Sequence, residues 1–341
     1  MLDVDSPSDD AQAIVLLCSS LSVPRGSSIR PLGPRSWAKL ERAVANSAIG
    51  RPAGLLGMAA GDIARLLGIA SDEADRYVQL LARSGQLAFE LDRLHARGMW
   101  VTTIVDDRYP ARLRERLGSD APPVLFGAGD RALLGLGGIA VVGSRDADDA
   151  AIAFTERLAD SAVAGHAQVV SGGARGVDEA AMRAAFARGG RVIGVLPEGV
   201  ERRIRDVDTR SAVGDGRAVI VSPYHPAAGF SAGAAMARNK LIYALSDVAV
   251  VVSSASGSGG TWEGAVEALK ASWVPVLVRD EDGVPEGNRE LIRRGAYALP
   301  ADAVDSPLTA AELIARAEPT VRVAEEAASY GQPSLWEEPE A

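Results

Sequence analysis

Glycine, serine and arginine recur directly after apolar runs of this chain, a combination that suits the binding of anions. Glycine lets the backbone approach an anion closely and offer N–H donors, and arginine can hold a phosphate through two hydrogen bonds. The residues concerned are Gly143, Ser144, Arg145, Ser171, Gly172, Gly173, Arg175, Gly176, Ser256, Gly257 and Ser258. They predict an anion-binding rim; the alternative is that the glycines serve close packing alone.

The apolar runs before these turns are typical of buried parallel strands. They are short, continuous and rich in β-branched residues, and helical segments separate most of them. The predicted strands are 139–142, 168–171, 192–196, 218–222, 248–252 and 274–278. Repeated strand–helix units predict an α/β protein with a Rossmann-like, doubly wound parallel sheet over residues 138–300. The carboxyl ends of such strands meet at one edge, and we expect the glycine-rich turns there.

A second source of positive charge is the segment 236–242, which contains Arg238, Asn239 and Lys240. We expect this segment to begin a helix just before the fifth predicted strand. The amino-terminal end of that helix would then face the same edge of the sheet and add a partial positive charge there. The alternative is an ordinary pair of solvated basic side chains.

The sequence argues against dinucleotide binding, P-loop hydrolysis, disulfide bonds and metal binding. The turn at Gly143 lacks the G-x-G-x-x-G pattern of dinucleotide-binding folds, and 256–261 lacks the Gly-Lys-Ser/Thr ending of a P-loop. A single cysteine, Cys18, and three histidines without ligand-like spacing predict neither a disulfide framework nor a metal site. We therefore expect no cofactor and no catalytic metal.

The rest of the chain divides into four predicted parts. Residues 1–34 gather proline and glycine towards their end, which predicts an irregular, loose or weakly helical arm. Residues 35–97 show helical periodicity and predict a small all-helical domain of the SAM or helix-hairpin-helix type. We interpret 98–137 as a connector with short strands at 100–104 and 122–126. We interpret 301–341 as an acidic tail with one helix over 309–317 and disorder after Pro319.

The formal net charge of −9 comes from the two ends of the chain. Residues 1–10 contribute −4 and residues 301–341 contribute −7, so the part between them carries +2. The overall charge therefore argues neither for nor against a nucleic-acid partner. No apolar run reaches the roughly 18 residues of a membrane span, and acids precede the short apolar stretch 11–20. We expect a cytoplasmic protein with no membrane partner.

The sheet domain resembles, in divergent form, the Rossmann-like domain of the DprA/Smf family, the DNA-processing proteins of natural transformation. The matching stretches are 141–145, 171–178, 238–242, 287–288 and 291–296, together with 109–110 and 122–126 in the connector. The resemblance implies single-stranded DNA binding, a homodimer formed through the sheet domain, loading of a RecA-type recombinase in DNA recombination, and no catalytic turnover. It places the DNA pocket at Gly143, Ser144, Arg145, Ser171, Gly172, Arg175, Arg238, Asn239 and Lys240.

A rim of this composition would hold phosphates without reading bases. Binding should therefore be independent of nucleotide sequence and sensitive to salt. Aromatic residues on which bases could stack are sparse nearby. Tyr224, Phe230 and Trp262 are the candidates, and each could instead pack in the core.

The chain departs from the family at 200–206, where a Tyr-Pro is absent, and in the loop that continues as 259–263. That loop resembles the LOG-type nucleoside 5′-monophosphate phosphoribohydrolases, which share the fold. In this alternative, Arg238 holds the phosphate and Glu263 stabilises the ribosyl oxocarbenium ion or activates water. Glu263 could equally be a first-turn acid favoured by its helix dipole. A nucleotide-sensing binding module is a third reading of the same residues.

The acidic tail contains one short motif. Gln332–Trp336 resembles the bacterial sliding-clamp-binding pentapeptide, with tryptophan where phenylalanine is usual. An aromatic and aliphatic anchor in a disordered tail could dock on a clamp, so a sliding clamp is a candidate partner.

Overall fold

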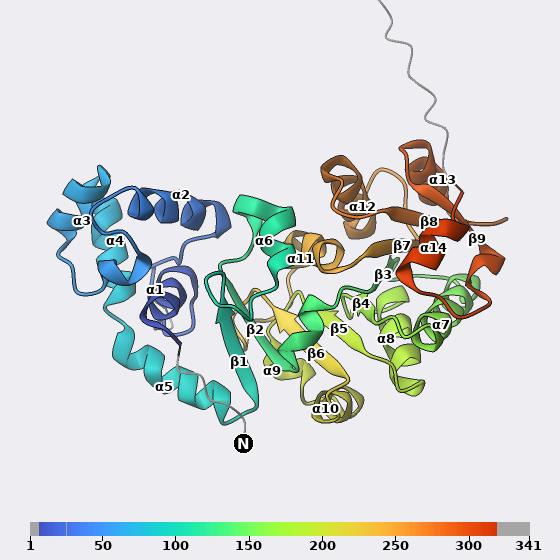
Figure 1. Cartoon of the computed structure of the whole chain (residues 1–341), viewed down its shortest axis with the longest axis horizontal. Coiled ribbons are helices and arrows are strands. Elements are labelled where there is room, and N and C mark those ends of the chain that lie inside the picture. The colour runs from blue at the N-terminus through green and yellow to red at the C-terminus, as the bar shows by residue number, and fades with distance from the viewer. Residues whose placement is uncertain (1–6, 25, 319–341) are drawn as a thin grey trace, which may run out of the picture.

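One sheet of nine strands runs through residues 7–24 and 26–318, the part of the chain that the computed structural model describes (Figure 1). The strands are β1 (Met99–Thr103), β2 (Val124–Gly129), β3 (Ile139–Gly143), β4 (Val169–Ser171), β5 (Val192–Val195), β6 (Ala218–Ser222), β7 (Val248–Ser253), β8 (Val276–Asp280) and β9 (Tyr297–Pro300). The prediction of an α/β fold with a doubly wound sheet is confirmed, and the six predicted strands correspond to β3–β8.

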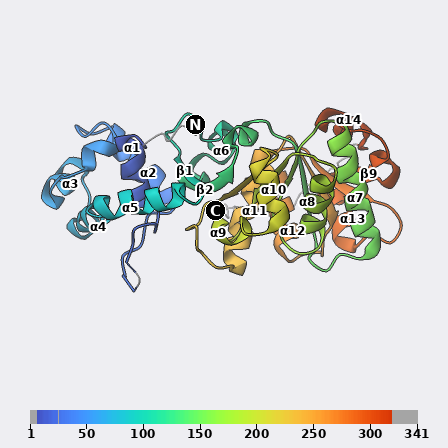
Figure 2. The ribbon, with the colours of Figure 1, turned by 90° about the horizontal axis from the view of Figure 1, so that it is seen from below.

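Most of the helices flank this sheet, and the others form a separate group at one end of it. The helices are α1 (Asp9–Cys18), α2 (Pro34–Ala45), α3 (Ala60–Leu67), α4 (Ser71–Leu81), α5 (Ser84–His95), α6 (Ala111–Leu117), α7 (Asp149–Ala164), α8 (Val177–Ala187), α9 (Val200–Arg203), α10 (Val207–Gly214), α11 (Ala232–Leu245), α12 (Gly260–Ala271), α13 (Glu286–Arg293) and α14 (Ala310–Arg316). In Figures 1 and 2, α1–α5 lie together at the β1 end, away from β9. Within the described ranges, no helix is long and apolar enough to cross a membrane.

The order of the strands creates a switch point between β3 and β7. The full order is β1-β2-β6-β5-β4-β3-β7-β8-β9. From β3 the chain moves outward through β4, β5 and β6, then returns along α11 to place β7 on the other side of β3. Across the sheet, each neighbouring pair from β6 through β5, β4, β3, β7 and β8 to β9 is parallel. In sheets of this kind ligands bind beyond the carboxyl ends of the strands at the switch point, which lies here after Gly143 and Ser253.

The predicted connector over 98–137 is wrong as a separate part, because its strands extend the sheet. β1 pairs with β2, and β2 pairs with β6, both antiparallel. Gly129, the last residue of β2, permits this pairing, because a Cβ atom there would overlap the backbone of Ala218. Sequence patterns locate such strands but do not show which sheet they join.

The predicted arm over 1–34 is wrong for α1. Ile14, Leu16 and Leu17 are at most 1% exposed, and neighbouring positions on the other side of the helix are buried as well. A helix that is apolar all round must be covered on all sides, and α1 is packed among α4, α5 and β1. The helical region predicted over 35–97 contains α2–α5, so α1 is the helix around which that region is built.

The predicted boundary of the tail at residue 301 is wrong, because the first part of the tail belongs to the sheet domain. The helix predicted over 309–317 is confirmed by α14. Val304, Leu308 and Leu313 are fully buried, and the Leu308 N–H donates to the carbonyl of Ser161 on α7. α14 begins with a capping box in which Thr309 and Glu312 exchange hydrogen bonds with each other's backbone N–H groups. The remainder of the tail, with the clamp-like motif Gln332–Trp336, lies outside the described residues.

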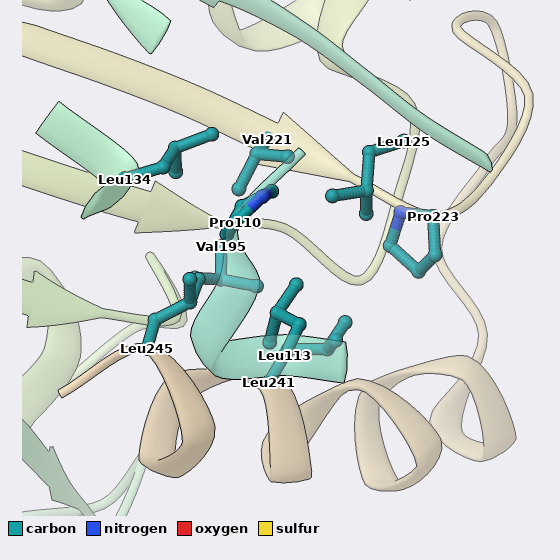
Figure 3. A pocket seen from close by; sticks show the side chains of 9 residues that line it. All are labelled: Pro110, Leu113, Leu125, Leu134, Val195, Val221, Pro223, Leu241 and Leu245. Carbon is teal, nitrogen blue, oxygen red and sulfur yellow. The ribbon is translucent and has the colours of Figure 1, made fainter. Parts of the chain in front are cut away.

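An apolar junction fixes α11 to the sheet (Figure 3). Its side chains come from β2, β5, β6, α6, α11 and adjoining turns, and they point toward one another. They are Pro110, Leu113, Leu125, Leu134, Val195, Val221, Pro223, Leu241 and Leu245. The space between them is too small for a water molecule. Burial of this many apolar side chains holds α11, and hence Arg238 on it, at a set distance from the strands.

Asn288 plays a similar part at the end of β7. It is fully buried at the start of α13, where its Oδ1 accepts from the Ser254 N–H at 2.9 Å. Its Nδ2 donates to the carbonyls of Val252 at 3.0 Å and Arg279 at 2.9 Å. One side chain thus ties the end of β7 to β8 and sets the course of the loop that leads into α12.

Replacing Asn288 with alanine should lower the free energy of unfolding by about 3 kcal/mol, because three buried backbone groups lose their partner. Chemical denaturation measures this loss. The control is Asn46→Ala at an exposed position after α2, for which we expect a change within about 0.5 kcal/mol. Equal effects of the two substitutions would contradict the bracing role of Asn288.

Candidate functional site

A cavity of about 340 Å³ lies at the switch point. Its walls come from the turn after β3, the loop that enters α8, the helix α11, and the loop that joins β7 to α12. Six of the predicted site residues line it: Gly143, Ser144, Arg145, Arg238, Asn239 and Ser258. The strand order and the glycine-rich turns therefore lead to the same place.

The glycines of the site act mainly through packing. A Cβ atom on Gly143 would overlap Val177 on α8. Gly176 has φ of 85°, and a Cβ atom there would overlap the carbonyl oxygen of Ser144. On Gly172 it would overlap the guanidinium of Arg238. These contacts bring the turn after β3, the start of α8 and the middle of α11 together around the cavity.

Arg238 and Asp178 form a buried pair of opposite charges beside the cavity. Their exposed fractions are 2% and 7%. Burial lowers the pKa of Arg238 and raises that of Asp178 to about 6, and each charge partly offsets the effect of burial on the other. The Asp178 carboxylate also accepts from the backbone N–H groups of Gly143, Gly172 and Ala174.

The guanidinium of Arg238 retains unused hydrogen-bonding capacity. Its Nε and Nη1 atoms are buried and find no hydrogen-bond partner among the residues that the structure describes. The Tyr243 hydroxyl, on the same helix and also lining the cavity, shares this property, and burial raises its pKa. Buried donors of this kind are uncommon in folded proteins and mark sites where a ligand or water can bind.

At the mouth of the cavity, Arg145 is exposed, and its guanidinium lies 5.0 Å from the centre of the Phe230 ring. Within residues 7–24 and 26–318 it forms no ion pair. Phe230 is 53% exposed. Of the other aromatic candidates, Trp262 is buried under Arg294, and the Tyr224 hydroxyl donates to the carbonyl of Ala234.

The remaining predicted site residues do not line the cavity. Arg175 is exposed and pairs with Asp146 at 2.6 Å, and Lys240 lies 3.7 Å from Glu267 on α12. Ser171 is buried, and its hydroxyl donates to the carbonyl of Val141. The other members of this group are Gly172, Gly173, Gly176, Ser256 and Gly257.

The prediction that a helix begins at Met236 is wrong, because α11 already begins at Ala232. Ser231 caps it by accepting from the Ala234 N–H at 3.1 Å. The alanine-rich stretch before Arg238 favours helix. Arg238 therefore lies in the middle of α11. The first turns of α11, through Ala232 and Ala235, line the cavity, as does the amino terminus of α12.

Two features of the cavity were not predicted from the sequence: the positions of Asp178 and Tyr243, and the contact between Asn239 and Gly260. Asp178 lies in a stretch that resembles the family, and Tyr243 lies in an apolar stretch. Nothing in their spacing shows that they face Arg238. Gly259, Gly260 and Thr261, at the start of α12, line the cavity as well. The Asn239 amide donates to the carbonyl of Gly260 at 2.9 Å and so joins α11 to α12.

Glu263, the acid of the hydrolase alternative, is exposed in the first turn of α12 and does not line the cavity. This position suits a carboxylate that interacts with the helix dipole.

Comparisons with known proteins show the family to which the chain belongs. Residues 100–307 match the family described as DNA recombination-mediator protein A, and the chain belongs to this family. It is 31% identical over 204 residues to the DNA processing protein DprA of Streptococcus pneumoniae, a match that covers 57% of this chain and 68% of that protein. It is 32% identical over 235 residues to a DprA protein of Mycobacterium tuberculosis, of which it spans 57%.

Two solved structures are also similar. The structure of Streptococcus pneumoniae DprA has a TM-score of 0.63 and 24% identity, covering 84% of this chain and 99% of that one. A structure of DNA processing protein A from Helicobacter pylori, described for its single-stranded DNA binding mode, has a TM-score of 0.49 and 25% identity, covering 58% and 90%. The similarity to the Streptococcus pneumoniae structure supports the fold assignment.

The raised pKa of Asp178 predicts a pH-dependent stability. Between about pH 4 and pH 6 the folded protein keeps a proton that the unfolded chain has released, so this contribution to the free energy of unfolding falls as pH rises. Asp178→Asn cannot ionise. Between pH 4 and pH 7 the wild type should therefore lose about 3 kcal/mol relative to this variant, measured by chemical denaturation at several pH values.

Asp206 supplies a control of opposite sign. The N–H of Thr209 holds the pKa of Asp206 below its ordinary value, so the wild type should gain stability relative to Asp206→Asn as pH rises from acid values. A flat difference for Asp178→Asn, or one with the sign of Asp206→Asn, would contradict the burial of an ionised Asp178.

Proposed function

We propose that this protein binds single-stranded DNA at the switch-point cavity and acts in DNA processing and recombination. The observation that carries the proposal is the convergence of Arg145, Arg238 and the amino terminus of α12 on one cavity. Each of these groups attracts phosphate. Membership in the DNA recombination-mediator protein A family supports DNA as the source of that phosphate.

In this proposal the two cavity arginines have different tasks. Arg145 is exposed and can meet a phosphate of the strand before water is excluded. Arg238 is buried and can hold only a group that enters the cavity. Neither arginine needs to read a base edge, so affinity should be nearly the same for all sequences. The exposed ring of Phe230 offers a face on which one base could stack.

Arg175 would extend the contact beyond the cavity. Its pairing with Asp146 joins two exposed side chains, and such pairs contribute about 0–1 kcal/mol. A phosphate can therefore replace the Asp146 carboxylate at small cost. We assign Arg175 a weaker contact than Arg145 because it lies outside the cavity lining.

The description of the family supports a role as mediator rather than as enzyme. We propose that the protein passes its strand to a RecA-type recombinase, that it acts as a homodimer, and that it does so in the cytoplasm. No catalytic turnover is proposed, since the acid of the hydrolase alternative, Glu263, is exposed outside the cavity.

Arg145→Ala should weaken binding to unrelated single-stranded oligonucleotides by the same factor. It should also reduce the slope of log affinity against log salt by about 0.7, the value for one lost phosphate contact. Fluorescence anisotropy at several salt concentrations measures both quantities. Arg175→Ala should show a smaller loss of affinity.

The matched control is Arg183→Ala, which removes an exposed arginine on α8 that pairs with Glu156 away from the cavity. Its affinity and salt slope should equal those of the wild type. If Arg145→Ala also binds like the wild type, or loses affinity for only some sequences, the cavity is not the DNA site.

A further inference from the structure

Two side chains that line the cavity carry hydrogen-bond donors without a partner among the described residues. Arg238 contributes Nε and Nη1, and Tyr243 contributes its hydroxyl. All three atoms are buried on α11, and none has a hydrogen-bond partner among the described residues. Because an unpaired buried donor is costly, the wall is suited to a ligand that brings several acceptors and negative charge.

Asp178 does not use up these donors. Its carboxylate accepts from the N–H groups of Gly143, Gly172 and Ala174 while it faces Arg238. The pair therefore keeps Arg238 charged and oriented, and it leaves Nε and Nη1 of Arg238 without a hydrogen-bond partner in the described part of the chain. Glu198 and Tyr224 also face Arg238, and Arg145 adds a second positive charge near it.

The start of α12 supplies donors from a third direction. Gly259, with φ of 93°, is the residue before the helix and provides no capping side chain. Gly260 and Thr261 in the first turn line the cavity. The first N–H groups of a helix have no partner inside the helix and attract anions, most strongly phosphate.

These donors fit the end of a phosphate ester better than the middle of a strand. Arg238 is 2% exposed and lines the cavity. An internal phosphodiester would have to carry a sugar on each side into a space of about 340 Å³ and out again. A phosphomonoester enters on one sugar and presents three terminal oxygens with a charge of about −1.5 to −2.

We propose that the cavity binds a terminal phosphomonoester, with Arg238, Tyr243 and the amino terminus of α12 as its donors. This inference deepens the proposed function and rests on it for the strand that carries the phosphate. The same chemistry is present in a phosphorylated strand end and in a free nucleoside monophosphate. In the first case the protein engages DNA at its ends, with the internal phosphates left to Arg145 and Arg175.

The test compares labelled oligonucleotides of one sequence that carry a 5′-phosphate, a 3′-phosphate or hydroxyls at both ends. Fluorescence anisotropy with the full chain measures their affinities. We expect a phosphorylated end to bind about tenfold more tightly than the unphosphorylated strand. Nucleoside 5′-monophosphate and inorganic phosphate, added as competitors, distinguish the sources of the phosphate. Competition only by phosphorylated strands assigns the site to strand ends. Competition by the mononucleotide assigns the site to nucleotides.

Tyr243→Phe removes one donor and retains the packing of the ring. It should reduce the preference for the phosphorylated end about threefold. Tyr77→Phe, in which the lost hydroxyl bonds Glu73 on α4, is the matched control and should keep the full preference. Arg238→Met, checked for folding by circular dichroism, should abolish the preference.

The outcomes separate this inference from the proposed function. Equal affinities of wild type for phosphorylated and unphosphorylated strands would overturn the phosphomonoester site and leave single-stranded DNA binding intact. A preference for phosphorylated ends that survives both Tyr243→Phe and Arg238→Met would also overturn it. Binding of nucleoside monophosphate without binding of any strand would support the site and contradict the proposed function.

Discussion

Arg238 is a charged side chain held inside the sheet domain, and the arrangement around it follows from the need to compensate that charge. Asp178 on α8 supplies the opposite charge, and three backbone N–H groups in turn donate hydrogen bonds to Asp178. Glycine at 143 and 172 allows the strand ends to approach this pair. A larger residue at either position would separate the two charges, which is costly at sites screened from water.

Burying the charges of Arg238 and Asp178 costs free energy, which indicates that the pair serves a purpose other than stability. A buried pair of opposite charges seldom stabilises a fold more than apolar packing would, and here Nε and Nη1 of Arg238 have no hydrogen-bond partner among the described residues. The apolar junction of α6, α11 and the strands could hold α11 in place without any charge (Figure 3). The pair is therefore better explained by ligand binding than by stability, and its place at the switch point of the sheet agrees with that explanation.

The sequence predicted the parts of this structure that depend on local pattern. Strands β3–β8 are buried on both faces, so each appears as a continuous β-branched run, and the turns after them carry their glycines visibly. β9 was not predicted, because Tyr297–Pro300 is short and ends in proline. The helix α1 was not predicted because the proline and glycine near positions 24–34 dominated the interpretation, whereas the apolar run before them decides its burial.

The candidate site was predicted only in part, for reasons of helix phase and side-chain direction. Arg145, Arg175 and Arg238 look alike in the sequence. Only the start of α11 at Ala232 fixes which way Arg238 points, and only the course of the loop before α8 turns Arg175 outward to Asp146. That Tyr243 and the start of α12 face the same space depends on the packing of α11 against α12, which no local pattern encodes.

Hydrogen–deuterium exchange of the full chain, with and without single-stranded DNA, tests the central claim most directly. The account predicts that DNA slows exchange in the turn after β3, in residues 255–261 and in the first turns of α11, and leaves α1–α5 and α14 unchanged. Protection confined to α1–α5 or to the β9 end of the sheet, with unchanged exchange around Arg145 and Gly260, would contradict it.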